Sequence, residues 1–412
     1  MTQAANLSLG PSRRRASPES GLAGNIDMTS GPSTEAALFV FAGGGTGGHL
    51  YPGLAVAEQL QKLLPSSFIH WAATPRMIDQ RLLTEMGDAY IRQTVQPFSK
   101  NIRRWPSFYR AWRESCNFWD EFFNQHQVAA VLALGGYAAA PASRVANERK
   151  IPVALLNPDA KMGLANRYLA RRATAIFTQW PMTMSGGGAD LFNVTGVPLR
   201  ASLFHRSREK SIAALGLVSD RQTLVITGAS LGAGTINAAW CELMRDEEVL
   251  SELNHPQRPW QILHLTGTAE FAKVQQVASA SGVAHWKVMD YCDDMGGVWA
   301  AADLAITRAG AGLCAELEAC GVPAILMPYP FHRDRHQHAN AEKLVLHGAA
   351  VMLEDRLEAA ANGPPLKKLL LEMLRGDHRR QSMRAAALAN GKPTAAVQIA
   401  KWLCRAAGRS IA

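Results

Sequence analysis

The 412-residue sequence has no apolar run of the ~18 residues that a membrane-spanning helix requires. Its best candidate, residues 128–142, is interrupted by Gly135, Gly136 and Tyr137. No apolar core follows the arginines near its start, so we expect no secretory signal. The six cysteines show neither paired spacing nor a CxxC motif, which predicts reduced thiols in a cytosolic protein. These absences argue against integral membrane proteins and disulfide-rich secreted domains.

Acidic residues are absent between Ala89 and Arg113, whereas six basic residues occur there. The sequence has a net charge of +9 but carries no nucleic-acid-binding motif, so we expect no nucleic-acid partner. Aromatic residues alternate with the basic ones over residues 98–123, a pattern typical both of a membrane-surface contact and of a core helix with a solvated basic face. The candidate membrane patch consists of Arg103, Arg104, Trp105, Phe108, Arg110 and Trp112.

What is present is an alternation of apolar strands with helical segments. Residues 1–36 lack periodic hydrophobicity and predict a disordered tail. Two series follow, and each opens with a strand, a glycine-rich loop and a helix, at residues 37–64 and again from residue 222. We therefore expect an α/β protein of two Rossmann-like domains facing each other across a cleft, residues 37–198 and 199–390, with a last helix in 391–412 that packs back on the first domain.

The sharpest motif is the glycine loop Gly43–His49, in which five glycines let the backbone approach a ligand closely. The start of the following helix favours an anion there. A tight turn without a ligand accounts for an isolated glycine loop equally well. The sequence lacks the Gly-Lys-Ser/Thr of a P-loop, and no acidic residue ends the next strand as in a dinucleotide-binding domain. His49 is either a helix cap or a side chain directed into the cleft.

Three further segments carry polar chemistry. A second glycine loop, Gly228–Gly234, occupies the equivalent place in the second series. Arg308–Gly312 precedes Glu316, whose carboxylate is suited either to ribose hydroxyls or to the helix dipole. His332, His336 and His338 are spaced poorly for a metal, and contacts to sugar hydroxyls fit Asp334, His336, Gln337 and Asn340 better. Because the chain also has no Asp-x-Asp pair, we expect no required metal and no cofactor.

Together these segments resemble the MurG family of peptidoglycan glycosyltransferases. The resemblance covers roughly residues 37–405 and rests on GGGTGGHLYPGLAVAEQL, LGGYAAAP, TGVPLR, GASLGAG, DYCDDM, RAGAGLCAE with GVPAILMPYP, and DRHQHANA. It implies the GT-B fold and inverting transfer of N-acetylglucosamine from UDP-GlcNAc to undecaprenyl-pyrophosphate-linked muramyl-pentapeptide (lipid I), which gives lipid II for peptidoglycan synthesis. It also implies a peripheral protein on the anionic cytoplasmic face of the cell membrane.

The resemblance implies a role for each matching residue. His49 would be the catalytic base, and Gly44, Gly45, Gly135, Gly136 and Tyr137 would bind the acceptor. The donor would be bound by Thr46, Gly47, Gly48, Asp159, Arg200, Ser230, Cys292, Ala311, Gly312, Leu313, Glu316, His336 and Gln337. Asp159 departs from the family, which has Asn there, and Ala309 replaces a family Ser. Two alternatives stay open: a related GT-B enzyme with another lipid acceptor, and a donor-binding protein without transferase activity.

Overall fold

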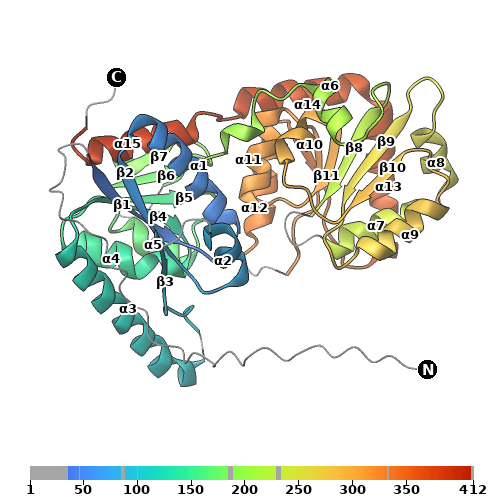
Figure 1. The fold of residues 1–412 in the computed structure, drawn as a ribbon. Coiled ribbons are helices and arrows are strands. Elements are labelled where there is room, and N and C mark those ends of the chain that lie inside the picture. Colours follow the sequence, from blue (N-terminus) through green and yellow to red (C-terminus); the bar gives the residue numbers. More distant parts are fainter. Residues whose placement is uncertain are drawn as a thin grey trace, which may run out of the picture. The chain divides into compact units, whose positions relative to one another are not determined.

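The computed structural model describes residues 36–409 except 46, 85–88, 100, 184–188, 229–232 and 332–333, without the side chains of 78, 81, 82 and 189. The predicted tail, apart from residue 36, therefore lies outside the described residues. Within the described part, thirteen strands form two parallel sheets, and helices alternate with the strands along the chain. Figure 1 shows this arrangement, with the first sheet in blue and green and the second in yellow and orange.

The first sheet contains seven strands in the spatial order 3-2-1-4-5-6-7. They are β1 (Ala37–Gly43), β2 (Ser67–Ala73), β3 (Tyr90–Arg92), β4 (Val128–Gly135), β5 (Val153–Asn157), β6 (Ala175–Thr178) and β7 (Phe192–Val194). The helices of this part are α1 (Gly47–Leu63), α2 (Met77–Leu83), α3 (Trp105–Gln125), α4 (Ala140–Glu148) and α5 (Leu164–Ala170). Central strands such as β1 are continuously apolar because helices cover both faces of a parallel sheet.

The second sheet contains six strands in the order 10-9-8-11-12-13. They are β8 (Gln222–Thr227), β9 (Trp260–Leu265), β10 (Trp286–Met289), β11 (Leu304–Thr307), β12 (Ala324–Leu326) and β13 (Ala350–Met352). The helices are α6 (Arg208–Ala214), α7 (Gly234–Leu243), α8 (Glu247–Leu253), α9 (Phe271–Ala280), α10 (Met295–Ala301), α11 (Ala311–Cys320), α12 (His336–Leu346), α13 (Ala359–Arg375) and α14 (Asp377–Asn390). The predicted fold class, two doubly wound α/β sheets, is confirmed.

The last helix, α15 (Ala395–Ala406), follows the second sheet in sequence but packs in the core of the first. Its buried residues Ile399, Ala400, Leu403 and Cys404 recur at helical spacing and form one apolar face. That face lies against α1, whose Leu50, Val56 and Leu60 belong to the same cluster. Helix α15 therefore belongs to the first sheet's domain, although it follows the second sheet in sequence.

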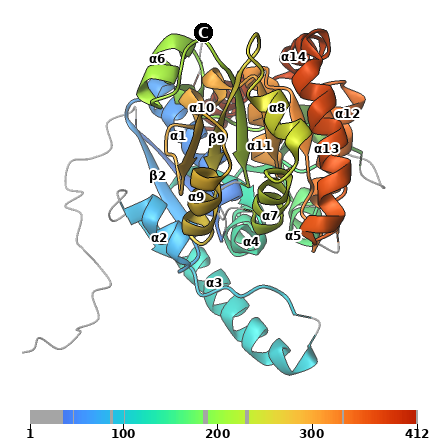
Figure 2. The same cartoon turned by 90° about the vertical axis from the view of Figure 1, so that its right-hand side faces the viewer.

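Helix α3 is buried towards its C-terminal end and exposed at its start. Trp119, Phe122 and Phe123 in its second half are buried beneath the first sheet. Its first six residues, from Trp105 to Arg110, include no fully buried residue. Both views show α3 beside α4 (Figures 1 and 2). The C-terminal part of the helix is therefore core, as the second interpretation predicted, and its first six residues are exposed or partly exposed.

Candidate functional site

The acceptor-site candidates meet at the switch point of the first sheet. Strands β1 and β4 are neighbours, and the chain leaves them in opposite directions along the sheet. In such sheets, ligands bind beyond the carboxyl ends of the two strands at this point. Gly44 and Gly45 follow β1, and Gly136 and Tyr137 follow β4, with Gly43 in register with Gly135. The structure therefore brings all five predicted acceptor residues to one edge of the sheet.

His49 lies in the first turn of α1, and its imidazole packs against the turn after β4. A Cβ on Gly136 would lie 3.2 Å from His49 Cε1, and one on Gly135 would lie 3.3 Å from Cδ2. Both glycines also have positive φ, so a side chain there would be strained in the backbone and would crowd the imidazole. Burial lowers the pKa of His49, and the negative charge of Asp159, a backbone hydrogen bond with Gly44 and the charge of Asp79 offset part of this effect. A neutral imidazole at neutral pH can accept a proton.

Asp79, which the sequence analysis did not identify, holds the glycine loop in place through hydrogen bonds. Its carboxylate is fully buried and accepts hydrogen bonds from the Gly45 N–H at 2.8 and 2.9 Å, and from the Thr74 N–H and hydroxyl at 2.9 and 2.6 Å. Arg76 donates to the Gly45 carbonyl at 2.9 Å. A Cβ on Gly44 would lie 2.4 Å from Asp79 Oδ2, so only glycine fits above the carboxylate. These contacts fix both polar groups of the Gly45 backbone.

The switch point of the second sheet lies between β8 and β11. Helix α11 begins directly after β11 without a side-chain cap, so its first N–H groups are available to an anion. Ala311, Gly312 and Leu313 form its first turn, and Glu316 lies one turn further on. Glu316 Oε2 accepts a hydrogen bond from Trp299 Nε1 at 2.7 Å. Burial raises the pKa of the Glu316 carboxyl to about 7, although the Trp299 bond opposes the rise.

The start of α12 lies beside this loop. Gln337 Oε1 accepts from the N–H groups of Ala309 and Tyr329, at 3.2 and 2.9 Å, so its side chain fixes the two loops that surround the start of α11. His336 Nε2 pairs with Asp334 at 2.8 Å, and its buried Nδ1 has no hydrogen-bond partner among the described residues. That nitrogen is out of contact with solvent.

Asp159 is the residue that departs from the family pattern, and it contacts α12. Its Oδ1 accepts from Asn340 Nδ2 at 3.0 Å, and the neighbouring Ala160 N–H donates to Asn340 Oδ1 at 2.8 Å. Asn340 is fully buried and also donates to the Ala309 carbonyl at 3.1 Å. The Asn340 amide therefore joins the loop after β5 to the loop after β11. Its contacts are with protein groups and not directed to a free surface.

The other predicted donor residues are more dispersed. Arg200 pairs with Glu58 of α1 at 2.8 Å, and no bond from it to a loop of the second sheet is found among the residues that the structure describes. Cys292 is partly buried against the cluster that contains Trp299 and Leu313. Gly47 is buried and Gly48 exposed at the start of α1. Thr46 and Ser230 lie outside the described residues.

The histidines of residues 332–338 do not converge in the described part of the chain. His338 pairs with Glu342 at 3.0 Å, one helical turn away, whereas His336 pairs with Asp334. His332 lies outside the described residues. No group of three or more His, Cys, Asp or Glu side chains arranged to bind a metal is found among the residues that the structure describes.

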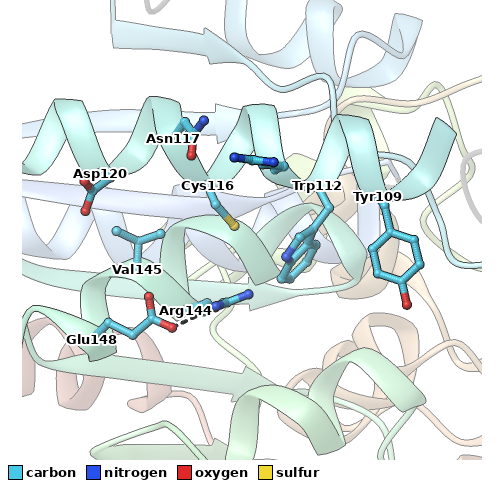
Figure 3. Close-up of a pocket in the computed structure, with 9 residues that line it drawn as sticks. Tyr109, Trp112, Cys116, Asn117, Asp120, Arg144, Val145 and Glu148 are labelled. Carbon is cyan, nitrogen blue, oxygen red and sulfur yellow. Dashed lines mark hydrogen bonds and ion pairs between the residues drawn. The ribbon is translucent and has the colours of Figure 1, made fainter. Parts of the chain in front are cut away.

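The exposed half of α3 carries a continuous aromatic surface. Phe98 contacts Trp105 and Phe108, and Phe108 stacks on Trp112, with ring centroids 5.5 to 6.1 Å apart. Arg103, Arg104 and Arg110 are exposed around it. A cavity of about 490 Å³ continues this surface between α3 and α4, where Trp112 and Cys116 face Val145 and the Arg144–Glu148 ion pair (Figure 3). No helix in the described part of the chain is long and apolar enough to cross a bilayer.

Comparison with known proteins defines the class. Residues 39–178 match the glycosyltransferase family 28 N-terminal domain, and residues 223–399 match the glycosyltransferase family 28 C-terminal domain. The two matches fall on the two sheets, so the chain is a glycosyltransferase built from two Rossmann-like domains.

Relatives narrow this class. The chain is 33% identical to the UDP-N-acetylglucosamine–N-acetylmuramyl-(pentapeptide) pyrophosphoryl-undecaprenol N-acetylglucosamine transferase of Thermodesulfovibrio yellowstonii, over 89% of this chain and 98% of the relative. It is 32% identical to the protein of the same name from Halothermothrix orenii, over 86% and 95%. The crystal structure of Acinetobacter baumannii MurG superposes with a TM-score of 0.68 at 25% identity, covering 90% of this chain and 99% of that one. The chain belongs to this transferase family, the MurG family.

Proposed function

We propose that the protein transfers N-acetylglucosamine from UDP-GlcNAc to the muramyl residue of undecaprenyl-pyrophosphate-linked lipid I, giving lipid II. The observation that carries the proposal is the pairing of two switch-point sites: His49 with the Gly44–Gly45 and Gly135–Tyr137 turns on one sheet, and the α11 start with Glu316 on the other. The first site supplies a base and close backbone approach, and the second supplies an anion site next to a carboxylate.

In the proposed mechanism, the acceptor hydroxyl attacks the anomeric carbon opposite the bond to UDP. A carbon–oxygen bond to the acceptor forms as the bond to the diphosphate breaks, which inverts the anomeric configuration. The neutral imidazole of His49 takes the hydroxyl proton. The N–H groups at the start of α11 and the guanidinium of Arg200 stabilise the negative charge on the leaving diphosphate. Arg200 would exchange Glu58 for the donor, since that ion pair is solvent-accessible.

The donor contacts follow from the same geometry. Glu316 accepts hydrogen bonds from the ribose hydroxyls, the Cys292 backbone contacts the uracil, and His336 contacts the sugar. Gln337 is expected to act indirectly, because its side-chain oxygen is occupied by backbone N–H groups. Asp159 is held by Asn340, so we expect it to influence the site through its charge.

We further propose that the protein binds peripherally to the cytoplasmic face of the membrane through the aromatic and basic surface of α3. Exposed Trp105 beside Arg103, Arg104 and Arg110 is the combination that interfacial helices use. This surface brings the enzyme to an acceptor whose polyprenyl chain lies in the bilayer.

The test is an assay of purified protein with UDP-GlcNAc and a short-chain lipid I analogue. We expect equal amounts of UDP and of a disaccharide product whose new bond has the inverted anomeric configuration. UDP release with a diacylglycerol acceptor but not with the lipid I analogue would favour the related transferase. Donor binding without UDP release would favour a binding protein.

A further inference from the structure

The donor-site carboxylate has a partner that is buried and rigidly held. Trp299, on α10, is 1% exposed and packs in the apolar cluster of the second sheet with Val298, Leu313 and Leu317. Helix α10 is itself fixed at its start, where Asp294 accepts from the Gly297 N–H at 3.1 Å. The Trp299 indole therefore cannot reorient without disrupting the core.

The contact between the two side chains is short and uses one carboxylate oxygen. Trp299 Nε1 lies 2.7 Å from Glu316 Oε2, within the range of hydrogen bonds to a charged acceptor. No hydrogen bond to Oε1 is found among the described residues. The N–H thus fixes one oxygen and leaves the other for a ligand.

We infer that Trp299 is a positioning residue of the donor site: its indole N–H holds the Glu316 carboxylate in the orientation that the ribose hydroxyls require. This inference rests on the donor role proposed above for Glu316. Trp299 does not touch the donor but acts through Glu316. Because the N–H also favours the ionised carboxylate, its loss should be visible in the pH dependence of donor binding.

Burial of an indole does not by itself require a partner for the N–H in this protein. Trp180, in the same cluster as Trp299, is 2% exposed, and its Nε1 has no hydrogen-bond partner in the described part of the chain. A tryptophan-to-phenylalanine change at Trp180 removes the same atoms from the same core without touching a carboxylate. It is therefore a matched control for Trp299→Phe.

Other ionisable groups lie on α11 and on the elements packed against it. Burial raises the pKa of the Cys320 thiol, one turn further along α11, to about 12, so this thiol stays neutral. Among the ionisable side chains on or beside the elements packed against α11, Asp294 pairs with Arg206, Glu58 with Arg200 and Glu342 with His338, and on α11 itself Glu318 pairs with His347. Because histidines occur in these pairs, the experiment must isolate the contribution of Glu316.

The experiment is calorimetric titration of UDP-GlcNAc into the full-length protein between pH 6 and pH 8.5. For the wild type we expect affinity to fall as the pH drops below about 7, the pKa of Glu316. In Trp299→Phe the midpoint should move up by about one unit, which alone weakens donor binding about fivefold at pH 7, and the loss that remains at pH 8.5 reports the lost orientation of the carboxylate. Glu316→Gln should lack the transition, and adding Trp299→Phe to it should change nothing further.

The controls separate the possible failures. Trp180→Phe should keep the wild-type midpoint. Two results would overturn the role of Trp299. One is a midpoint of the pH dependence of donor affinity in Trp299→Phe that equals the wild-type midpoint. The other is an equal loss of affinity at every pH in both Trp299→Phe and Trp180→Phe. Normal donor binding by Glu316→Gln would instead overturn the proposed donor contact. If Trp299→Phe does not fold, a second measurement tests the inference: the NMR signal of the Trp299 indole N–H in ¹⁵N-tryptophan-labelled wild-type protein. Its chemical shift should change with pH around a midpoint near 7, and this change should be absent in Glu316→Gln. A shift of the wild-type indole signal that does not depend on pH would contradict the inference.

Discussion

His49 is the residue on which the proposed chemistry depends most directly. Replacement by alanine removes the base but leaves the loops of the second sheet intact, so we expect kcat to fall by about 10²–10⁴ with little change in donor affinity. Initial rates with the lipid I analogue, combined with calorimetric donor titration, measure both quantities. Near-normal turnover by His49→Ala would mean that the imidazole only packs against Gly135 and Gly136.

Asp79 should affect the acceptor side of the reaction through the loop that it shapes. Asp79→Asn keeps the volume of the side chain, but it removes the negative charge and places a buried amide N–H₂, with no acceptor, opposite the Gly45 N–H. Leaving buried donors unsatisfied costs about 1–3 kcal/mol, so we expect a lower melting temperature and a higher KM for the acceptor, with donor affinity unchanged. Exposed Asp220→Asn is the matched control. Equal losses of donor and acceptor affinity would show a general structural role instead.

The sequence predicted the residues of the site itself better than the residues that hold them in place. Gly44, Gly45 and His49 are visible because several glycines stand next to one histidine after an apolar strand. Asp79 and Trp299 carry no such local pattern. Asp79 is 34 residues from Gly45, and Trp299 is 17 residues from Glu316, so only the folded chain brings each pair together. The ion pair between Arg200 and Glu58, 142 residues apart, was hidden for the same reason.

At the scale of elements, strand β9 carries a titratable group that should make stability depend on pH. His264 is fully buried, bonded to Asn237 of α7 at 2.9 Å and stacked on Trp286 of β10. Burial lowers the pKa of His264 to about 3. In the unfolded chain its pKa returns to about 6.5, so below that pH the unfolded state binds a proton that the native state excludes. The contribution of neutral His264 is complete above pH 6.5 and is lost as the pH falls toward 3.

The measurement is urea unfolding followed by circular dichroism at pH 5, 6, 7 and 8. His264→Gln should be less stable than the wild type at pH 8. The difference between the two free energies of unfolding should then shrink by about 1.4 kcal/mol for each pH unit below 6.5. His378→Gln, which changes an exposed histidine, should follow the wild type at every pH. Parallel curves for His264→Gln and the wild type would contradict a neutral buried imidazole.

The elements that the sequence failed to predict are mainly short strands on the outer side of the sheets. β3, β7 and β13 each have three residues, too few to show a period, and none of them is buried over its whole length. β6 is fully buried, but its four residues are not distinguished from the helix before it. The long central strands β1, β4 and β8 were predicted because a continuous apolar run that leads into a glycine loop is typical of a buried parallel strand. Helix α3 was one of two interpretations of residues 98–123, and the sequence did not show which of its residues would be buried.

At the scale of the whole molecule, the repetition of strand, glycine loop and helix was sufficient to predict two Rossmann-like sheets. The strand orders confirm this, and both family 28 matches fall on these sheets. Periodicity did not show which loops would meet. The contacts of Asn340 with Asp159 and Ala160 are set by side-chain geometry, which no local pattern records.

The proposed membrane binding also concerns the whole molecule, because the bilayer would have to hold the enzyme while the site remains accessible. Basic side chains near an anionic surface contribute about 1 kcal/mol each, so changing Arg103, Arg104 and Arg110 to Glu should release the protein from vesicles that contain anionic lipid. Turnover of a water-soluble acceptor analogue should survive, since none of the three arginines is among the residues predicted to bind donor or acceptor. The matched control changes three exposed lysines of the second sheet's helices and loops, Lys210, Lys273 and Lys368, to Glu, with the same change in net charge. Sedimentation with vesicles measures binding. If both triple variants lose binding equally, net charge and not the α3 surface attracts the protein, and if neither does, the lipid contact lies elsewhere.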